Sequence, residues 1–228
     1  MTSGRSGEAW RVEIEGGEAT SAIFERASRA PTGTLFVCAH GAGGHMDDRG
    51  VRAAADALRG QGFDVVRFNF LYREKGGSRP DPMPRLQACI TAVVAHARDT
   101  VRPKILVLGG RSMGGRAASM LAAERFPCDG LLLLAYPLHP AGQLEKLRDA
   151  HLARIEVPVL CLNGTRDALC RRDLMERVVD GLADRWTMHW LEGADHSFHV
   201  LKSSGRSDAD VLQEIAEAGG AWAARLRS

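Results

Sequence analysis

The chain has 228 residues, 45% of them hydrophobic and 25% charged, which is ordinary for a globular protein that buries one sizeable core. Its 30 basic and 28 acidic residues leave a net charge of +2, so the composition does not favour nucleic acid as a partner. The longest apolar run, residues 131–138, is about half as long as a membrane-spanning helix requires. We therefore expect a protein with no membrane and no nucleic-acid partner.

The cysteines and the N-terminus bear on cellular location. The 5 cysteines have no spacing pattern and suit a reducing cytoplasm better than a disulfide framework. Residues 1–9 are polar and glycine-rich and lack the apolar segment of a secretory signal. No break in composition, repeat or low-complexity linker divides the chain. The sequence predicts a cytoplasmic protein with a single domain over residues 1–228, in which residues 1–9 are flexible.

Short apolar runs alternate with helical patterns along the chain. The expected strands are residues 10–15, 19–26, 34–39, 64–70, 104–109, 130–136, 157–162 and 186–191. Helices are expected at 51–58, from near 84 to 97, at 115–126, 145–153, 171–182 and 211–222, with a long loop at 71–83. The first two strands should form an antiparallel hairpin, and Ser207 with Asp210 should form a capping box. The later strands are continuously apolar, which indicates an α/β fold whose mostly parallel sheet has helices on both faces.

The stretch Gly110-Arg111-Ser112-Met113-Gly114 joins an apolar strand to a run of small residues typical of a helix. Glycines two residues before and after a serine suit a tight turn in which strand and helix pack closely and the serine backbone is strained. A hydroxyl held there lies at the positive end of a helix, where developing negative charge is favoured. We interpret Ser112 as a nucleophile. The alternative is a glycine-rich turn with no chemical role.

A serine nucleophile needs a base within hydrogen-bond reach and an acid that orients the base. Asp167 and His196 each follow an expected strand, and the carboxyl ends of parallel strands meet at one edge of a sheet. We therefore predict that Ser112, Asp167 and His196 act together. One alternative is that Asp167 only caps the helix near Arg171. Asp195 is the poorer acid, because neighbouring side chains point apart.

Two further histidines and the first glycine-rich loop allow other interpretations. His40 is expected to brace that loop by hydrogen bonding, and His199 is the fallback base. His196 and His199 lack a third ligand at metal-site spacing, so no metal is predicted. From Gly41, a dinucleotide-binding G-x-G-x-x-G would need glycine where Met46 stands. No cofactor is expected.

These motifs together resemble those of α/β-hydrolases. The matching segments are His40-Gly41-Ala42-Gly43, Gly110-Arg111-Ser112-Met113-Gly114, Gly164-Thr165-Arg166-Asp167 and Gly193-Ala194-Asp195-His196-Ser197-Phe198. The resemblance spans residues 10–226, and the Gly-Gly-Arg-Ser-Met-Gly-Gly-Arg block is similar to small, lidless members of the dienelactone-hydrolase-like and testis-expressed-30-like groups. Dienelactone hydrolases proper carry cysteine, and haloalkane dehalogenases aspartate, where this chain has Ser112. The resemblance implies an α/β-hydrolase fold and an oxyanion hole formed by the backbone N–H groups of Ala42 and Met113.

The substrate pocket should be shallow and open, because residues 138–156 leave no room for the lid domain of larger α/β-hydrolases. We expect Phe70, Tyr72 and Arg73 to form one wall and His139 the opposite wall. Six cationic residues raise the hypothesis of a basic rim that selects anionic substrates; the alternative is scattered, solvated side chains. They are Arg73, Lys75, Arg79, Arg85, Arg111 and Arg116.

The sequence thus predicts a serine hydrolase that cleaves a small carboxylic ester through an acyl-enzyme intermediate. Related alternatives are acyl transfer to an acceptor other than water and peptide-bond cleavage. A different class of function is a binding or scaffold protein that keeps the fold without turnover. The complete Ser–Asp–His set argues against the scaffold.

Overall fold

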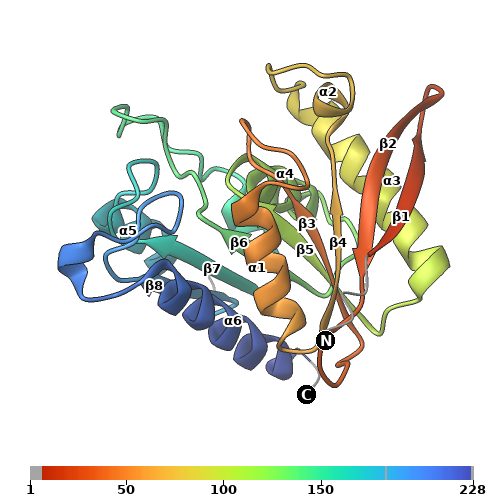
Figure 1. The fold of residues 1–228 in the computed structure, drawn as a ribbon. Helices are drawn as coiled ribbons and strands as arrows, with labels where there is room; N and C mark the ends of the chain where they lie inside the picture. Colours follow the sequence, from red (N-terminus) through yellow and green to blue (C-terminus); the bar gives the residue numbers. More distant parts are fainter. Residues whose placement is uncertain (1–6, 183, 227–228) are drawn as a thin grey trace.

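The computed structural model describes residues 7–182 and 184–226, in which the strands form one sheet (Figure 1). The strands are β1 (Glu8–Ile14), β2 (Glu18–Glu25), β3 (Thr34–Ala39), β4 (Phe63–Phe68), β5 (Ile105–Arg111), β6 (Gly130–Leu134), β7 (Val159–Gly164) and β8 (Trp186–Leu191). Their order across the sheet is β1-β2-β4-β3-β5-β6-β7-β8. β1, β2 and β4 pair antiparallel, and every pairing from β4 to β8 is parallel. The predicted fold class, with its N-terminal hairpin, is confirmed.

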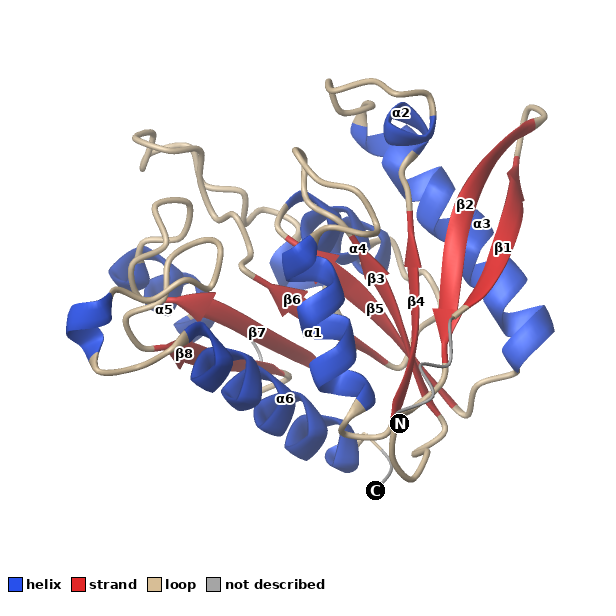
Figure 2. Cartoon of the chain, in the orientation of Figure 1, coloured by secondary structure: helices blue, strands red, loops and turns tan. Residues whose placement is uncertain are grey.

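Helices cover both faces of the sheet (Figure 2). The helices are α1 (Arg49–Arg59), α2 (Leu71–Glu74), α3 (Met83–Val101), α4 (Met113–Ala123), α5 (Arg172–Asp180) and α6 (Asp208–Arg225), with short 3-10 turns η1 (Leu152–Arg154) and η2 (Lys202–Ser204). Apolar side chains of α1 and α6 pack on one face, and those of α3, α4 and α5 pack on the other. Because both faces are covered, the central strands are buried throughout, as their unbroken apolar runs predicted.

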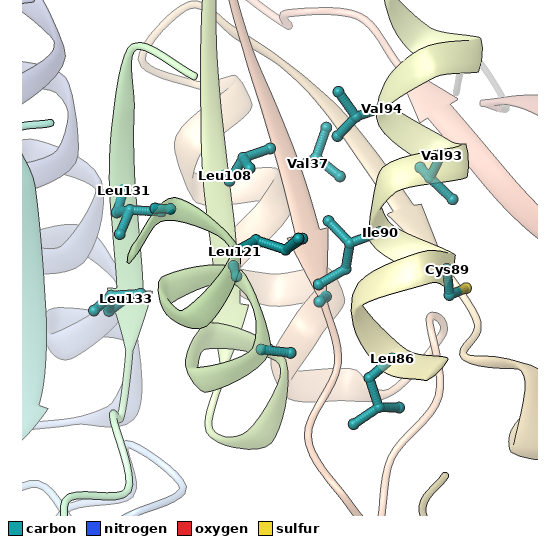
Figure 3. Close-up of a cluster of buried hydrophobic side chains, with 14 of the residues drawn as sticks. Val37, Leu86, Cys89, Ile90, Val93, Val94, Leu108, Leu121, Leu131 and Leu133 are labelled. Carbon is teal, nitrogen blue, oxygen red and sulfur yellow. The ribbon is translucent and has the colours of Figure 1, made fainter. Parts of the chain in front are cut away.

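The core between α3, α4 and the sheet shows how this packing works (Figure 3). Leu86, Ile90, Val93, Val94 and Ala97 recur at helical spacing on α3 and are all buried. They pack with strand residues such as Val37 and Leu108. Each fully buried aliphatic side chain contributes about 1.5–3 kcal/mol of transfer free energy. This apolar packing also holds α4 firmly against the sheet, and Ser112 is the residue immediately before α4.

One expected helix is wrong. Residues 145–153 form turns and irregular backbone that end in η1. The N–H of Arg148 donates to the carbonyl of Leu138 at 2.7 Å, and the Tyr136 hydroxyl donates to the Arg148 carbonyl at 2.6 Å. These tertiary hydrogen bonds use the backbone groups that a helix would need, so the local helical pattern is overridden.

Several smaller expectations can be compared with the structure. The capping box of α6 is confirmed, with Ser207 accepting from the Asp210 N–H and the Asp210 side chain accepting from the Ser207 N–H. The loop at 71–83 contains the single helical turn α2. Residues 8 and 9, expected to be flexible, belong to β1, and residues 1–6 lie outside the described residues. Within the described chain, no helix is both long and apolar enough to span a membrane.

Candidate active site

Ser112 lies in a sharp turn between β5 and α4. Its backbone has φ 51° and ψ −117°, an arrangement that costs a residue with a Cβ about 1–3 kcal/mol. A Cβ at Gly110 would collide with the Ala39 backbone, and one at Gly114 would lie 2.6 Å from the His40 carbonyl oxygen. Both glycines are therefore required for strand and helix to approach β3 closely. The turn holds the serine side chain at the carboxyl edge of the sheet.

Folding brings Ser112, His196 and Asp167 together from three separate loops. His196 Nε2 lies 3.0 Å from Ser112 Oγ, and His196 Nδ1 lies 2.8 Å from Asp167 Oδ2. A proton on Nδ1 satisfies the carboxylate and leaves Nε2 free to accept the serine proton. The Asp167 side chain is 0% exposed, whereas the imidazole is 26% exposed. The carboxylate is thus shielded from solvent, whereas the imidazole is partly exposed.

Asp167 is held by its own loop and by a buried asparagine. Its Oδ1 accepts from the Leu169 N–H at 2.8 Å, and its Oδ2 accepts from Asn163 Nδ2 at 3.3 Å. Asn163 lies at the end of β7 and also bonds the Tyr136 backbone through both its amide atoms. Asp167 makes no N-cap bond to α5, whose capping residue is Arg171. Sequence reasoning missed Asn163, although a polar residue at the end of an apolar strand was the available signal.

The loop that carries His196 is fixed by two other polar residues. Asp195 accepts from the N–H groups of Ser197 (2.7 Å) and His199 (3.0 Å), so it shapes the loop and does not face the imidazole. Arg111, the second residue of the elbow motif, donates from Nη2 to the His196 carbonyl at 2.9 Å. The elbow and the histidine loop are therefore directly connected. His199 contacts Asp208 and not Ser112.

The backbone N–H groups of Ala42 and Met113 are the two expected oxyanion donors. Neither the Ala42 nor the Met113 N–H donates in any of the backbone hydrogen bonds outside helices and strands in the described residues. The Gly41 carbonyl, which shares a peptide plane with the Ala42 N–H, accepts from His40 Nδ1 at 2.7 Å and from the Gly44 N–H at 3.1 Å. These two bonds turn the Ala42 N–H in the opposite direction, because the peptide is planar and trans.

His40 braces this loop, as predicted. Its Nε2 accepts from the Phe70 N–H at 3.1 Å while its Nδ1 donates to Gly41, which defines one neutral tautomer. Burial lowers its pKa to about 4, so the ring is uncharged at neutral pH. The histidine is therefore occupied on both nitrogens and is not available as a base for Ser112.

The side chains expected to line the substrate pocket lie deeper than predicted. Phe70 is fully buried, and Tyr72 is largely buried with its hydroxyl donating to the Ala42 carbonyl at 2.7 Å. Both rings pack against His40 and so support the glycine-rich loop that follows β3. His139 is buried, with Nδ1 bonded to the Pro140 carbonyl and Nε2 to the Arg171 N–H, which leaves no ring nitrogen for a substrate. Half-buried Arg73 donates to the Gly77 carbonyl.

Most members of the hypothetical basic rim have partners within the protein. Lys75 and Arg85 both pair with Glu18, and Arg111 is bonded to His196. Arg79 is exposed. Arg116, like Arg73, is half-buried and forms no ion pair within residues 7–182 and 184–226. Of these six cations, Lys75 and Arg85 are the ones that carboxylates of the described residues neutralise.

A second serine–histidine contact lies in the interior. Ser119 Oγ is 2.8 Å from His151 Nε2 and also donates to the Arg116 carbonyl at 2.8 Å. Ser119 is fully buried, and burial lowers the pKa of His151 to about 4. With its proton committed to a backbone carbonyl and no path to a substrate, Ser119 has a structural role that ties α4 to η1.

The buried histidines make the folded protein sensitive to acid. His40 and His151 have a pKa of about 4 when folded and 6.5 when unfolded, so the unfolded chain binds more protons between these values. Their contribution to stability is fully present above pH 6.5 and is lost as the pH falls through about 4, by at most roughly 3 kcal/mol each. Urea unfolding at neutral and acidic pH should show this loss, and His151→Gln should reduce it. An equal loss in the variant would contradict the assignment to His151.

No cluster of three or more His, Cys, Asp or Glu side chains suited to hold a metal ion occurs in the described part of the chain. The five cysteines are free thiols.

A parallel sheet, a strained serine turn after its β5 strand, and an acid and a histidine after β7 and β8 define the α/β-hydrolase fold class. Residues 32–224 match the family model described as an alpha/beta hydrolase domain. The chain belongs to this family. The segment between β6 and β7 holds only η1, so a lid domain is lacking in the described chain.

Solved structures share this fold over nearly their whole length. A serine hydrolase homologue from Coxiella burnetii is 20% identical, with TM-score 0.77, over 95% of this chain and 99% of that one. A lidless serine hydrolase from Xanthomonas campestris is 22% identical, with TM-score 0.77, over 97% of each chain. A dienelactone hydrolase from Anabaena variabilis is 18% identical, with TM-score 0.71, over 95% of each chain. At these identities the similarity establishes the fold.

Proposed function

We propose that this protein is a serine hydrolase that cleaves small carboxylic esters through an acyl-enzyme intermediate. The observation that carries the proposal is the pair of hydrogen bonds that joins Ser112 to His196 (3.0 Å) and His196 to Asp167 (2.8 Å). Two hydrogen bonds linked in this way convert a weak hydroxyl nucleophile into a reactive one. Membership in the alpha/beta hydrolase family also supports the proposal.

The first half of the reaction forms the acyl-enzyme. His196 Nε2 removes the Ser112 proton as Oγ attacks the ester carbonyl carbon, and the carbonyl oxygen becomes an oxyanion. The N–H groups of Ala42 and Met113 donate to that oxygen, and each such donor is worth about 3–4 kcal/mol in the transition state. The imidazolium then gives its proton to the departing alkoxide, and the C–O bond of the ester breaks.

The second half returns the enzyme to its starting state. Water occupies the position of the departed alcohol, and His196 takes one of its protons as the oxygen attacks the acyl carbon. Collapse of the second oxyanion breaks the bond to Ser112 Oγ, which regains the proton from His196. Throughout, Asp167 remains ionised, fixes the tautomer with Nδ1 protonated and stabilises the imidazolium.

The function is tested by labelling and turnover together. A fluorophosphonate probe should modify Ser112, identified by peptide mass spectrometry, and p-nitrophenyl acetate should be hydrolysed by the same preparation. Folded protein that neither reacts with the probe nor hydrolyses the ester would favour a scaffold without turnover. Transfer of the acetyl group to an added alcohol or amine in preference to water would favour an acyltransferase.

Arg111 should matter to the rate because it connects the elbow to the histidine loop. Its guanidinium is largely buried, and Arg111→Met would remove the donor to the His196 carbonyl. We expect kcat/KM to fall by roughly tenfold to a hundredfold, the penalty for a catalytic group displaced by about 1 Å. Arg111→Lys should recover part of the loss.

The matched control is Arg166→Met, which removes a similar arginine bond to the Gly193 carbonyl in the same loop. This control should change kcat/KM little, because Gly193 precedes the histidine by three residues and its arginine is exposed. Equal effects of the two variants would show that Arg111 only stabilises the loop as a whole.

A further inference from the structure

Residues 41–44 form a β-turn at the edge of the candidate site. The Gly44 N–H donates to the Gly41 carbonyl at 3.1 Å, so Ala42 and Gly43 occupy the two central positions. Neither central residue has a positive φ, which fits a type I turn and excludes type II. The turn lies against the proposed nucleophile, since a Cβ built on Gly41 would be 3.5 Å from the Ser112 Cβ.

Two carbonyl groups of this turn face the Tyr72 hydroxyl. The hydroxyl donates to the Ala42 carbonyl at 2.7 Å and lies 3.5 Å from the Gly41 carbonyl oxygen. Because each peptide is planar and trans, the N–H groups of the same two peptides, those of Gly43 and Ala42, point away from the hydroxyl. Successive N–H groups turned to one side form an anion-binding concavity, which is what an ester oxyanion requires.

The peptide between Ala42 and Gly43 has a second orientation open to it. Type I and type II turns differ by a flip of the central peptide, and type II needs a positive φ at the second central residue, which glycine accepts readily. Ala42 and Gly43 are both exposed, and among the described residues the Tyr72 hydroxyl is the one donor to the Ala42 carbonyl. A flip would turn that carbonyl oxygen to the side of the N–H groups, where it would repel an oxyanion.

Tyr72 is itself held in place from several directions. Its N–H donates to Asp81 Oδ2 at 3.0 Å, and its carbonyl accepts from the Gly77 N–H at 2.7 Å. The residue is 5% exposed, and its ring packs on the His40 ring with the centroids 5.9 Å apart. Burial raises the pKa of the Tyr72 hydroxyl to about 12, so the group remains a proton donor. Tyr72 therefore presents a fixed donor to the Ala42 carbonyl.

We propose that Tyr72 is a positioning residue for the oxyanion hole: its hydroxyl keeps the Ala42–Gly43 peptide in the orientation that binds the ester oxyanion. This proposal rests on the proposed function and gives a role to a side chain that the catalytic steps do not use. Tyr72 acts through the Ala42 carbonyl and not on the ester itself. Because an oxyanion forms in both halves of the reaction, the hydroxyl should affect acylation and deacylation alike.

Tyr72→Phe removes the hydroxyl and keeps the ring. We expect kcat for p-nitrophenyl acetate to fall roughly tenfold, less than the hundredfold or more that loss of a whole oxyanion donor costs. KM should change little, because acylation and deacylation slow together. Trifluoroacetone should bind more weakly by the same factor by which kcat/KM falls. Ser112 Oγ attacks its ketone carbon, the serine proton passes to His196, and the ketone oxygen becomes an anion in the oxyanion hole.

The matched control is Thr20→Val. Thr20 is fully buried, and its hydroxyl donates to the Asn69 carbonyl at 2.6 Å, just before the segment that carries Tyr72. The variant removes a comparable buried bond from the same region without touching the turn. It should lower the urea midpoint and leave kcat and the affinity for trifluoroacetone unchanged. Equal losses of kcat in Thr20→Val and Tyr72→Phe would overturn the positioning role.

A substitution at Gly43 tests the peptide flip directly. A Cβ at Gly43 would meet nothing within 4 Å, so alanine fits the present turn but resists the positive φ of the flipped one. In a Gly43→Ala background, Tyr72→Phe should therefore lower kcat by at most about twofold, against roughly tenfold in the wild-type background. A tenfold fall in both backgrounds would overturn the proposal.

Failure of this proposal and failure of the proposed function give different results. Hydrolysis of p-nitrophenyl acetate by the wild type, with kcat unchanged in Tyr72→Phe, would overturn the positioning role and keep the hydrolase. A folded wild type that neither hydrolyses the ester nor reacts with the fluorophosphonate would overturn both. If Tyr72→Phe does not fold, Asp81→Ala decides, because it releases the Tyr72 N–H and should lower kcat in the same direction. An unchanged kcat in Asp81→Ala would then count against the positioning role.

Discussion

Ser112→Ala should abolish ester hydrolysis while the protein stays folded. The Ser112 hydroxyl lies 3.0 Å from His196 Nε2, so its loss removes both the proposed nucleophile and the proton that the imidazole would accept. Loss of the nucleophile from a serine hydrolase lowers kcat by roughly 10⁶-fold. The variant should therefore hydrolyse esters no faster than the uncatalysed background. Hydrolysis of p-nitrophenyl acetate and labelling by a fluorophosphonate should disappear together.

The fold should tolerate this change because Ser112 makes few contacts that stabilise it. Far-ultraviolet circular dichroism and the urea midpoint should stay close to those of the wild type. Ser112→Gly supplies a sharper comparison: with φ 51° the Cβ is strained, and glycine relieves that strain. The glycine variant should be as inactive as the alanine variant but more stable by about 1 kcal/mol. Retained hydrolysis in either variant would show that another residue is the nucleophile.

Asp167→Asn should lower kcat by roughly 10³- to 10⁴-fold, although asparagine has almost the same shape as aspartate. The reason lies in the donors that surround the carboxylate. The Leu169 N–H bonds Oδ1 at 2.8 Å, a shorter and stronger contact than the 3.3 Å bond from Asn163 to Oδ2. The amide oxygen of an introduced asparagine should therefore occupy the Oδ1 position. Its NH2 group then faces His196 Nδ1.

An NH2 group beside Nδ1 reverses the tautomer of His196. Nδ1 becomes the acceptor and Nε2 carries the proton, so the ring can no longer accept a proton from Ser112. Activity should be measured together with the Ser112 labelling rate, and both should fall. Asp173→Asn, an exposed aspartate paired with Arg171, is the control and should leave both rates unchanged. A small effect of Asp167→Asn on both rates would show that another group orients the imidazole.

Local patterns in the sequence predicted the sheet and most of its helices. The unbroken apolar runs of β3, β5, β6 and β7 reflect burial on both faces, which depends on the strands themselves. The glycines around Ser112 likewise follow from a local requirement, since the turn leaves no space for a Cβ at Gly110 or Gly114. The helix expected at residues 145–153 failed because the hydrogen bonds of Arg148 come from residues that its own pattern does not contain.

The sequence nominated the candidate site residues, but the folded structure decided which contacts each of them makes. Chain order and the position after each strand were enough to nominate Ser112, Asp167 and His196, because parallel strands deliver their following loops to one edge. That Asp195 shapes its own loop and that Asn163 holds Asp167 depends on where single atoms lie after folding. The side chains expected to line the substrate pocket also depended on tertiary structure. Tyr72 and His139 are turned inward and form hydrogen bonds with loop carbonyls.

What the sequence determined by itself was the order of buried strands, the strained serine turn and the three residues that can form a proton-transfer chain. These features are encoded by the size and polarity of neighbouring residues along the chain. Only the tertiary structure decided which charges are neutralised and which are not. Glu18 pairs with Lys75 and Arg85, because ion pairing depends on contacts between segments far apart in sequence.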